Sequence, residues 1–296
     1  MTRSGSPSLA PGFSRACDTH VHVFDPARFP LQPDRTYTPG LASHSDLTRF
    51  LDGQGLERVV LVQPSVYGTD NACLLDALVR LGPARARAIA VVDDEGPGQA
   101  TLADMHAKGV RGIRLNIEVA GTTAAQCRER LQTLGWLRRQ AGWCLQLHAS
   151  LPLILELTGD LADLGVPVVL DHFAGIHKQP QPSGPAWAPL LEFLQQGPGY
   201  VKLSAPYRRH PSWQEAMLTA LAASLASAAP SRILWGSDWP HTGGEADKPR
   251  DPAHIEPFRT IDNNGILAGL HASLGTEGFR RMLMDNPQRL FGFAPT

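Results

Sequence analysis

Short runs of β-branched or apolar residues alternate with longer amphipathic stretches along the whole chain. Eight such runs predict buried strands: Ala16–His22, Arg58–Gln63, Arg87–Val92, Gly109–Asn116, Cys144–Ala149, Pro167–Phe173, Tyr200–Ala205 and Ile233–Asp238. The stretches around them predict helices: Ser45–Gln54, Asn71–Leu81, Gly98–Lys108, Ala124–Ala141, Pro152–Leu164, Ala188–Gln195, Ser212–Ala228, Phe258–Leu274 and Thr276–Leu290. Alternating strands and helices form parallel sheets, so the pattern predicts an α/β protein. Eight such units favour a single closed (β/α)8 barrel, a TIM barrel, over an open doubly wound sheet.

The length agrees with one barrel domain. The chain has 296 residues, and α/β barrels take about 250. We expect a flexible, polar tail over residues 1–14 and a single domain over residues 15–296. The Gly/Pro-rich segments Lys178–Pro189 and Thr242–Ala253 follow predicted strand ends, so we interpret them as loops or lids at the barrel mouth.

Composition narrows the class of partner. Hydrophobic residues make up 43% of the chain and charged residues 19%, which excludes a disordered protein. The formal net charge of -1 argues against a nucleic-acid or membrane-surface binder. No apolar run approaches the roughly 18 residues of a membrane helix. Four scattered cysteines and a polar start predict reduced thiols and a cytoplasmic location, and the oligomeric state stays open.

Polar residues gather at the ends of the predicted strands, where barrel enzymes carry out chemistry. His20 and His22 lie two apart at the end of the first run and share one face. The fifth, sixth and eighth runs reach His148, His172 and Asp238. Imidazoles and a carboxylate suit one divalent ion, typically zinc, with a position left for water. Such an ion lowers the pKa of bound water from ~15.7 towards ~7, and Asp238 is our candidate for the base that takes its proton.

Five stretches carry a family resemblance and span nearly the whole chain. They are CDTHVH at Cys17–His22, VQPSVYGTDN at Val62–Asn71, RGIRLN at Arg111–Asn116, VLDHF at Val169–Phe173 and LWGSDWPH at Leu234–His241. With them the chain resembles the amidohydrolase-related branch of the amidohydrolase superfamily, and within it the 2-pyrone-4,6-dicarboxylate lactonases and similar lactone hydrolases. The resemblance implies a distorted (β/α)8 barrel that hydrolyses a cyclic ester.

The resemblance also implies roles for individual residues. His20, His22, His172 and Asp238 would form the catalytic centre, with Asp238 as the general base. The histidines would polarise the carbonyl group or hold a metal ion. The positions that match substrate contacts in such lactonases are Tyr37, Ser65, Arg114 and Arg208.

Two departures from the lactonase pattern change the expectation. The dicarboxylate lactonases resemble metal-free enzymes with tyrosine at the end of the fifth strand, where this chain has His148. One zinc or manganese ion is therefore expected, held by His20, His22, His148, His172 and Asp238, with metal-independent activity as the alternative. The segment Ile117–Gly121 lacks the further cation of those lactonases, which favours a different carboxylated lactone. Because no lysine ends the fourth run and Lys202 belongs to the seventh, we predict no two-metal site.

Arginines near two strand ends are candidates to hold a substrate carboxylate, because a guanidinium binds it through two parallel hydrogen bonds. Arg111 and Arg114 lie on opposite faces of the fourth run. We prefer Arg114, which shares its face with Asn116 and is nearer the catalytic end. Arg208 follows the seventh run, and we favour it over its neighbour Arg209.

Other polar residues in the matching stretches receive narrower predictions. Ser65 lacks a GxSxG turn, so we expect a hydrogen-bond donor to substrate and not a nucleophile. Tyr67 and His241 are further candidate substrate contacts. Asp18 and Asp171 are expected to face away from the barrel axis and to anchor the backbone or loops.

The sequence thus predicts a hydrolase that opens a small carboxylated lactone, of the 2-pyrone-4,6-dicarboxylate or muconolactone kind, in the breakdown of aromatic compounds. Two alternatives remain on the same barrel: amide hydrolysis, and non-oxidative decarboxylation of an aromatic acid. A non-catalytic barrel that binds small carboxylates is a third, against which the complete histidine and aspartate set argues.

Overall fold

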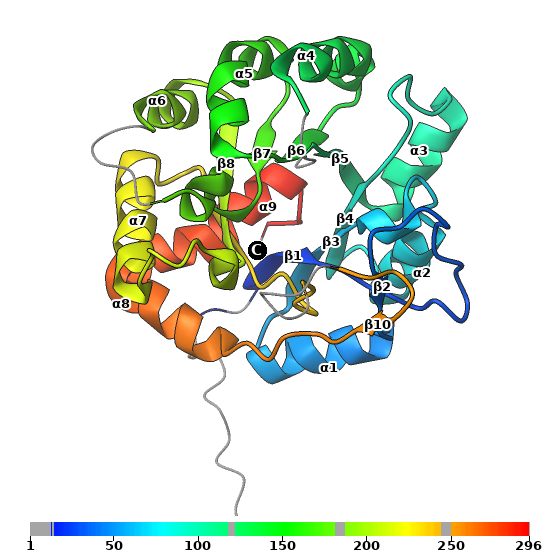
Figure 1. The fold of residues 1–296 in the computed structure, drawn as a ribbon, viewed down its shortest axis with the longest axis horizontal. Helices are drawn as coiled ribbons and strands as arrows, with labels where there is room; N and C mark the ends of the chain where they lie inside the picture. The colour runs from blue at the N-terminus through cyan, green and yellow to red at the C-terminus, as the bar shows by residue number, and fades with distance from the viewer. Residues whose placement is uncertain (1–12, 14, 118–121, 181–186, 244–249, 296) are drawn as a thin grey trace, which may run out of the picture.

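Eight parallel strands form the barrel at the centre of the molecule, with helices packed around it (Figure 1). This computed structural model describes residues 13, 15–117, 122–180, 187–243 and 250–295. The strands are β1 (Cys17–Val21), β3 (Arg58–Val62), β4 (Ala86–Ala90), β5 (Val110–Asn116), β6 (Cys144–His148), β7 (Val168–Leu170), β8 (Gly199–Ser204) and β9 (Ile233–Gly236). Each lies within or one residue beyond a predicted run, and the predicted TIM barrel is confirmed.

The helices that cover the barrel follow the strands in the expected order. They are α1 (His44–Gln54), α2 (Ala72–Leu81), α3 (Gln99–Lys108), α4 (Ala124–Thr133), α5 (Leu151–Asp163), α6 (Ala188–Gln196), α7 (Glu215–Ala228), α8 (Asn263–Arg280) and α9 (Asn286–Phe291). Short 3-10 helices follow several strands: η1 (Ser65–Tyr67), η3 (His172–Lys178) and η4 (Pro206–Arg208). These short turns at the strand ends carry several of the candidate site residues.

The first and last strands meet and nearly close the barrel. The backbone N–H of His22 donates to the Trp239 carbonyl at 2.8 Å, and the N–H of Asp238 donates to the His20 carbonyl at 2.9 Å. A parallel bridge also joins Val21 to Trp239. This closure places the histidines of β1 beside the aspartate that follows β9, although they come from opposite ends of the chain.

The inside of the barrel changes from apolar to polar towards the mouth formed by the carboxyl ends of its strands. One apolar cluster inside it contains Cys144, Val169, Tyr200 and Leu234, and the C-terminal Phe291 and Phe293 pack into the same cluster. Two residues further along their strands, Gln146 and Lys202 are also fully buried. Since side chains on a strand face one side every second residue, the next positions, His148 and Ser204, lie at the mouth. Apolar packing thus fills one end and leaves polar groups at the other.

The structure refines several predicted boundaries. The predicted helix Ala124–Ala141 is α4 followed by the 3-10 helix η2 (Leu134–Arg139). The chain after β9 forms α8, which is kinked at Gly275 with φ +66°, and then the π-helix η5 (Arg281–Asp285) and α9. A two-stranded sheet of β2 (Thr38–Pro39) and β10 (Ile255–Glu256) was not predicted, because each strand has only two residues.

One described residue of the predicted N-terminal tail packs against α8. Phe13, placed in the tail, is 8% exposed and packs edge-to-face on Phe279 with ring centroids 5.1 Å apart. The rest of the predicted tail, most of Ile117–Gly121, and parts of the loops Lys178–Pro189 and Thr242–Ala253 lie outside the described residues. No helix in the described part of the chain is long and apolar enough to cross a membrane.

Candidate active site

His20 and His22 lie at the end of β1 that faces the barrel mouth, where the pairing of β1 with β3 is irregular. The pairing of β1 with β3 shifts register between Asp18 and Val21, as a β-bulge does when it re-aims side chains. The Asp18 carboxylate accepts the backbone N–H groups of His20 and Ser237, both at 3.0 Å. Asp18 therefore anchors the backbone between β1 and β9, in the manner predicted for it.

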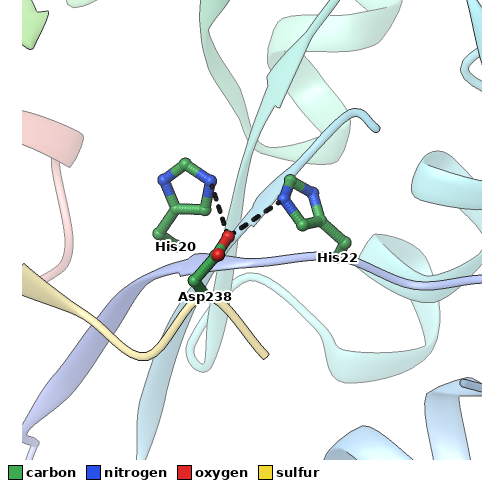
Figure 2. A group of neighbouring side chains, drawn as sticks. All are labelled: His20, His22 and Asp238. Carbon is green, nitrogen blue, oxygen red and sulfur yellow. Dashed lines mark ion pairs between the residues drawn. The ribbon is translucent and has the colours of Figure 1, made fainter. Parts of the chain in front are cut away.

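Asp238 lies between the histidines and a second group of donors. Its Oδ1 is 3.6 Å from His20 Nε2 and 3.5 Å from His22 Nε2 (Figure 2). Its Oδ2 accepts the Tyr207 hydroxyl at 2.6 Å and Arg208 Nη2 at 2.9 Å. The backbone of Asp238 is left-handed, with φ +63°, a conformation that is uncommon for non-glycine residues and clusters at functional sites. One carboxylate oxygen is thus held by the protein, and the other faces the imidazoles.

His172 and His148 complete the ring of imidazoles. The His172 ring centroid lies 4.9 Å from that of His20 and 5.0 Å from that of His148. His172 Nδ1 is 2.8 Å from the Ser204 hydroxyl, which orients its ring. Together with the contacts of Asp238, these distances show that all five side chains singled out in the sequence converge at one end of the barrel.

The predicted orientation of Asp171 was wrong. Its carboxylate points into the barrel, whereas the sequence predicted that it faces away from the barrel axis. It lies two residues after the inward-facing Val169, and its Oδ1 is 3.3 Å from His20 Nδ1. The prediction assumed that Asp171 and His172 alternate between faces. The strand has ended by then, and His172 has a left-handed backbone with φ +51°, which turns its side chain inward as well.

His148 lies on a positively charged side of the site. Its Nδ1 is 3.5 Å from Arg114 Nη2, and its Nε2 is 3.2 Å from Lys178 Nζ. Two candidate metal-binding groups occur among the described residues, one of His20, His22 and Asp238 and one of His20, Asp171 and His172. Neither includes His148, so its predicted role as a ligand stays a prediction.

The group of His20, His22 and Asp238 fits a divalent metal ion. The Val62 carbonyl lies 2.8 Å from His22 Nδ1. A carbonyl only accepts, so Nδ1 carries a proton, and Nε2 is the nitrogen that faces Asp238 and can bind a metal ion through its lone pair. His20 Nε2 is buried without a hydrogen-bond partner among the described residues. Tetrahedral zinc with bonds of about 2.0–2.2 Å separates its ligand atoms by roughly 3.3–3.6 Å, the spacing found around Asp238 Oδ1.

Burial and charge set the protonation states that this arrangement needs. Burial would raise the pKa of the Asp238 carboxyl, but Arg208 and the neighbouring histidines hold that pKa well below its usual value. Burial lowers the pKa of His20 to about 3 and holds the pKa of His172 well below its usual value. Near pH 7 the site therefore combines an ionised Asp238 carboxylate with neutral His20 and His172, as a general base and metal ligands require.

The two arginines predicted to hold substrate have different surroundings. Arg114 is 8% exposed and lies beside His148 and Asp171, with its Nε 3.7 Å from Asp171 Oδ2. Arg111 donates to the backbone carbonyls of His106 and Val110 outside the site, in line with the preference for Arg114. Arg208 is bound to Asp238 and to the Thr242 carbonyl at 2.8 Å, so it holds the Asp238 carboxylate, and its contact with substrate stays a prediction.

Tyr67 is held by contacts within the protein. Its hydroxyl accepts the backbone N–H of Asp25 at 3.0 Å, and its ring stacks on Phe24. These contacts support the loop, and a contact of Tyr67 with substrate stays a prediction. No single-sequence signal separates a tyrosine that supports a loop from one that faces the site.

The other predicted contacts border the site. Tyr37 is buried with the Arg250 guanidinium 3.6 Å above its ring. His241 lies beside Tyr207, with ring centroids 6.0 Å apart, and its Nε2 is 3.1 Å from the Asn263 amide nitrogen. Ser65 is exposed at the first position of η1. Their roles towards substrate remain predictions.

Sequence reasoning missed three residues of the site. Tyr207 binds Asp238 directly, while Lys202 and Gln146 lie beneath the histidines. A signal was present for two of them. Gln146 precedes His148 by two residues, and Lys202 stands between the apolar Val201 and Leu203, so parity along the strand places both inside the barrel.

A family comparison decides the class of protein. The amidohydrolase family model matches residues 17–293, almost the whole chain. The chain belongs to the amidohydrolase family. The resemblance stated from the sequence motifs is thereby confirmed.

Similar proteins place this amidohydrolase among lactone hydrolases and their structural neighbours. It is 31% identical to the 4-sulfomuconolactone hydrolase of Hydrogenophaga intermedia, an alignment that covers 93% of this chain and 88% of that one. It is 29% identical to a 2-pyrone-4,6-dicarboxylate hydrolase of Comamonas testosteroni, over 93% of this chain and 90% of the other. A solved Agrobacterium tumefaciens structure matches with a TM-score of 0.78 at 25% identity, over 98% and 99% of the two chains. The relatives agree with the predicted lactone hydrolase.

Proposed function

We propose that this amidohydrolase opens a small anionic lactone by adding water to the ester carbonyl. The observation that carries the proposal is the Asp238 carboxylate, fixed through Oδ2 and facing His20 and His22 through Oδ1. Its lactone-hydrolysing relatives at about 30% identity support the choice of ester. Aromatic-compound breakdown is the setting that fits such substrates.

Asp238 supplies the base. Tyr207 and Arg208 occupy Oδ2, so Oδ1 is the atom that takes the proton of the attacking water. The water oxygen bonds to the carbonyl carbon, and the ring C–O bond then breaks. The proton passes from Asp238 to the leaving oxygen, which gives one ring-opened acid for each lactone and water consumed.

The imidazoles are arranged to hold the group that would stabilise charge on the carbonyl oxygen. His20, His22 and Asp238 would hold a divalent metal ion, which when bound lowers the pKa of water and polarises a carbonyl group. His22 is fixed for this role by the Val62 carbonyl, and the His172 ring is oriented by Ser204. Ligands preset in this way need no reorganisation during the reaction.

The charge beside the site formed by the four histidines and Asp238 favours an anionic substrate. Arg114 and Lys178 approach the two ring nitrogens of His148, so positive charge borders one side of the site. We propose that Arg114 receives a substrate carboxylate or sulfonate there, with Tyr37, Ser65 and His241 as further contacts. The names of the relatives' substrates carry such groups.

A panel of substrates tests the proposal. The purified full chain is mixed with 4-sulfomuconolactone, with 2-pyrone-4,6-dicarboxylate, with an aryl amide and with hydroxylated benzoic acids, and absorbance is followed in the ultraviolet. We expect one of the lactones to be opened with one oxygen atom incorporated from labelled water. Release of carbon dioxide from an aromatic acid, or amide cleavage without lactone opening, would assign the alternative reactions. Binding of the lactones without turnover, with or without zinc, would identify a non-catalytic barrel.

A further inference from the structure

A second layer of polar side chains lies beneath the histidines, deeper in the barrel, and takes no direct part in the proposed hydrolysis. Lys202 of β8 and Gln146 of β6 are 0% exposed, and Asp171 is 1% exposed. A charged lysine is almost never buried this completely unless it is paired. Its partners therefore indicate its role.

Hydrogen bonds link Lys202 to Gln146 and Gln146 to Asp171, with Lys202 as the first donor and Asp171 as the last acceptor. Lys202 Nζ donates to Gln146 Oε1 at 2.7 Å. An ammonium group only donates, so this bond fixes which end of the Gln146 amide is the oxygen. The amide nitrogen then donates to Asp171 Oδ2 at 3.0 Å. The chain of donors ends on Asp171 and holds its carboxylate in place.

The other oxygen of Asp171 faces the ring of His20. Asp171 Oδ1 lies 3.3 Å from His20 Nδ1 and 3.6 Å from Lys202 Nζ, and Lys202 Nζ is itself 3.3 Å from His20 Nδ1. The two neighbours of Nδ1 favour opposite tautomers, because the Lys202 ammonium can donate to Nδ1 only when that nitrogen carries no proton. A proton on Nδ1 instead supplies a donor to Asp171 Oδ1, which has no hydrogen-bond partner among the described residues, and leaves the Nε2 lone pair facing Asp238. Lys202 Nζ lies closer to Gln146 Oε1, at 2.7 Å, than to His20 Nδ1, which leaves Nδ1 to Asp171. Carboxylate-to-histidine contacts of this kind orient metal ligands in many proteins.

We propose that Lys202 is a positioning residue for the metal centre. Through Gln146 and Asp171 it holds His20 in the tautomer whose Nε2 faces Asp238 and binds a divalent ion. The inference rests on the proposed function, since it concerns the same site. It differs from a purely structural reading, in which Lys202 only balances the buried charge of Asp171 and its loss costs stability alone.

Zinc affinity of the full chain separates these two readings. Zn²⁺ is titrated against a chromophoric chelator with the wild type and with Lys202→Met, which keeps the length of the side chain and removes its charge and donors. We expect Lys202→Met to bind zinc roughly 10–100-fold more weakly. The matched control is Arg87→Met, because Arg87 is a buried cation at the other end of the barrel, where it donates to the carbonyls of Phe291 and Gly292. We expect it to lose stability and to keep wild-type zinc affinity.

A double-mutant cycle tests whether Lys202 acts through Asp171. Asp171→Asn removes the charged acceptor of His20, so we expect it to weaken zinc binding by itself. Adding Lys202→Met to it should then change zinc affinity little further. Wild-type affinity in Lys202→Met, or a full additional loss in the double variant, would overturn the proposal.

A second variant and a spectroscopic readout keep the proposal testable if Lys202→Met does not fold. Gln146→Leu leaves Lys202 in place and breaks the donor chain, and we expect weaker zinc binding from it as well. In the zinc-loaded wild type, nitrogen NMR should show His20 protonated at Nδ1, and a proton found on Nε2 would overturn the inference. Lactone turnover by the wild type is scored separately, so a protein that binds zinc in this way but opens no lactone would refute only the function.

Discussion

At the scale of single residues, the two oxygens of one carboxylate have different tasks. Asp238 Oδ2 is bound by a tyrosine and an arginine, and Oδ1 faces two imidazoles. The first set of contacts fixes the position of the carboxylate and keeps it ionised. The second places its remaining lone pairs where a proton or a metal ion is to be received.

Replacing this carboxylate should abolish most of the reaction. Asp238→Asn keeps an acceptor for Arg208 but cannot take up a proton at neutral pH. We expect kcat for lactone opening to fall roughly 10²–10⁴-fold, while circular dichroism shows an intact fold. Turnover within a few-fold of the wild type would refute the assignment of the base.

Arg208 should control the acid side of the pH profile. The base works when ionised, that is, above the pKa of Asp238, and Arg208 is foremost among the charges that hold that pKa low. In Arg208→Gln, burial still raises the pKa of Asp238, but the positive charge that lowers this pKa is gone. As the pH is lowered, the variant should therefore lose activity at a higher pH than the wild type. Arg208→Lys keeps the charge and should keep the acid limb of kcat close to that of the wild type. An unchanged acid limb in Arg208→Gln would contradict this cause.

Residue-level prediction from the sequence was most reliable at strand ends. His20, His22, His172 and Asp238 could be placed together because carboxyl ends of barrel strands meet at one mouth. The predicted orientation of Asp171 was wrong. It assumed that side chains keep alternating between faces after β7 ends at Leu170, but the backbone at His172 is left-handed.

At the scale of elements, the junction of β1 and β9 sets the geometry of the site. Gly236 ends β9 directly against His20, and a Cβ built on it would lie 2.5 Å from His20 Cβ and 3.0 Å from His20 N. Only the absence of a side chain lets the two strands approach this closely. The same junction carries the hydrogen bond between Asp238 N and the His20 carbonyl.

A methyl group at this junction should therefore damage the site more than the fold. Gly236→Ala pushes His20 away from Asp238, and a displacement near 1 Å costs about 10²-fold in rate. We expect a loss of this order in kcat/KM. Gly159→Ala in α5 is the control, because a Cβ there meets nothing within 4 Å and helix propensity favours alanine. Equal effects of the two substitutions on kcat/KM would contradict the account.

Element prediction succeeded where apolar periodicity is long and failed where it is short. All eight barrel strands and most helices follow the hydrophobic pattern of the sequence. The two-residue strands β2 and β10 have no period to detect. The kink of α8 lies at Gly275, which has a left-handed backbone. The sequence alone does not show whether such a glycine ends a helix or only kinks it.

At the scale of the whole molecule, the barrel separates stability from chemistry. Its apolar end is packed by the C-terminal segment, which Arg58 and Arg87 hold by hydrogen bonds to the carbonyls of Ala294, Phe291 and Gly292. The groups that we propose to be catalytic lie at the other end. Changes at the apolar end should therefore alter folding without altering the reaction.

Removing one aromatic ring from the apolar end tests this separation. Phe291 is fully buried, and Phe291→Ala should lower the free energy of unfolding by about 3–5 kcal/mol. The kcat per folded molecule should remain that of the wild type. Val79→Ala, at an exposed position of α2, should change stability by less than about 0.5 kcal/mol. A large fall in kcat for folded Phe291→Ala would contradict the separation.

The site formed by His20, His22 and Asp238 is expected both to hold a metal ion and to open a lactone. Metal content and lactone turnover are measured in the same full-chain preparation, before and after chelation and after zinc is returned. We expect about one equivalent of divalent metal, loss of metal and turnover together, and recovery of both with zinc. Full lactone turnover by metal-free protein would contradict this expectation.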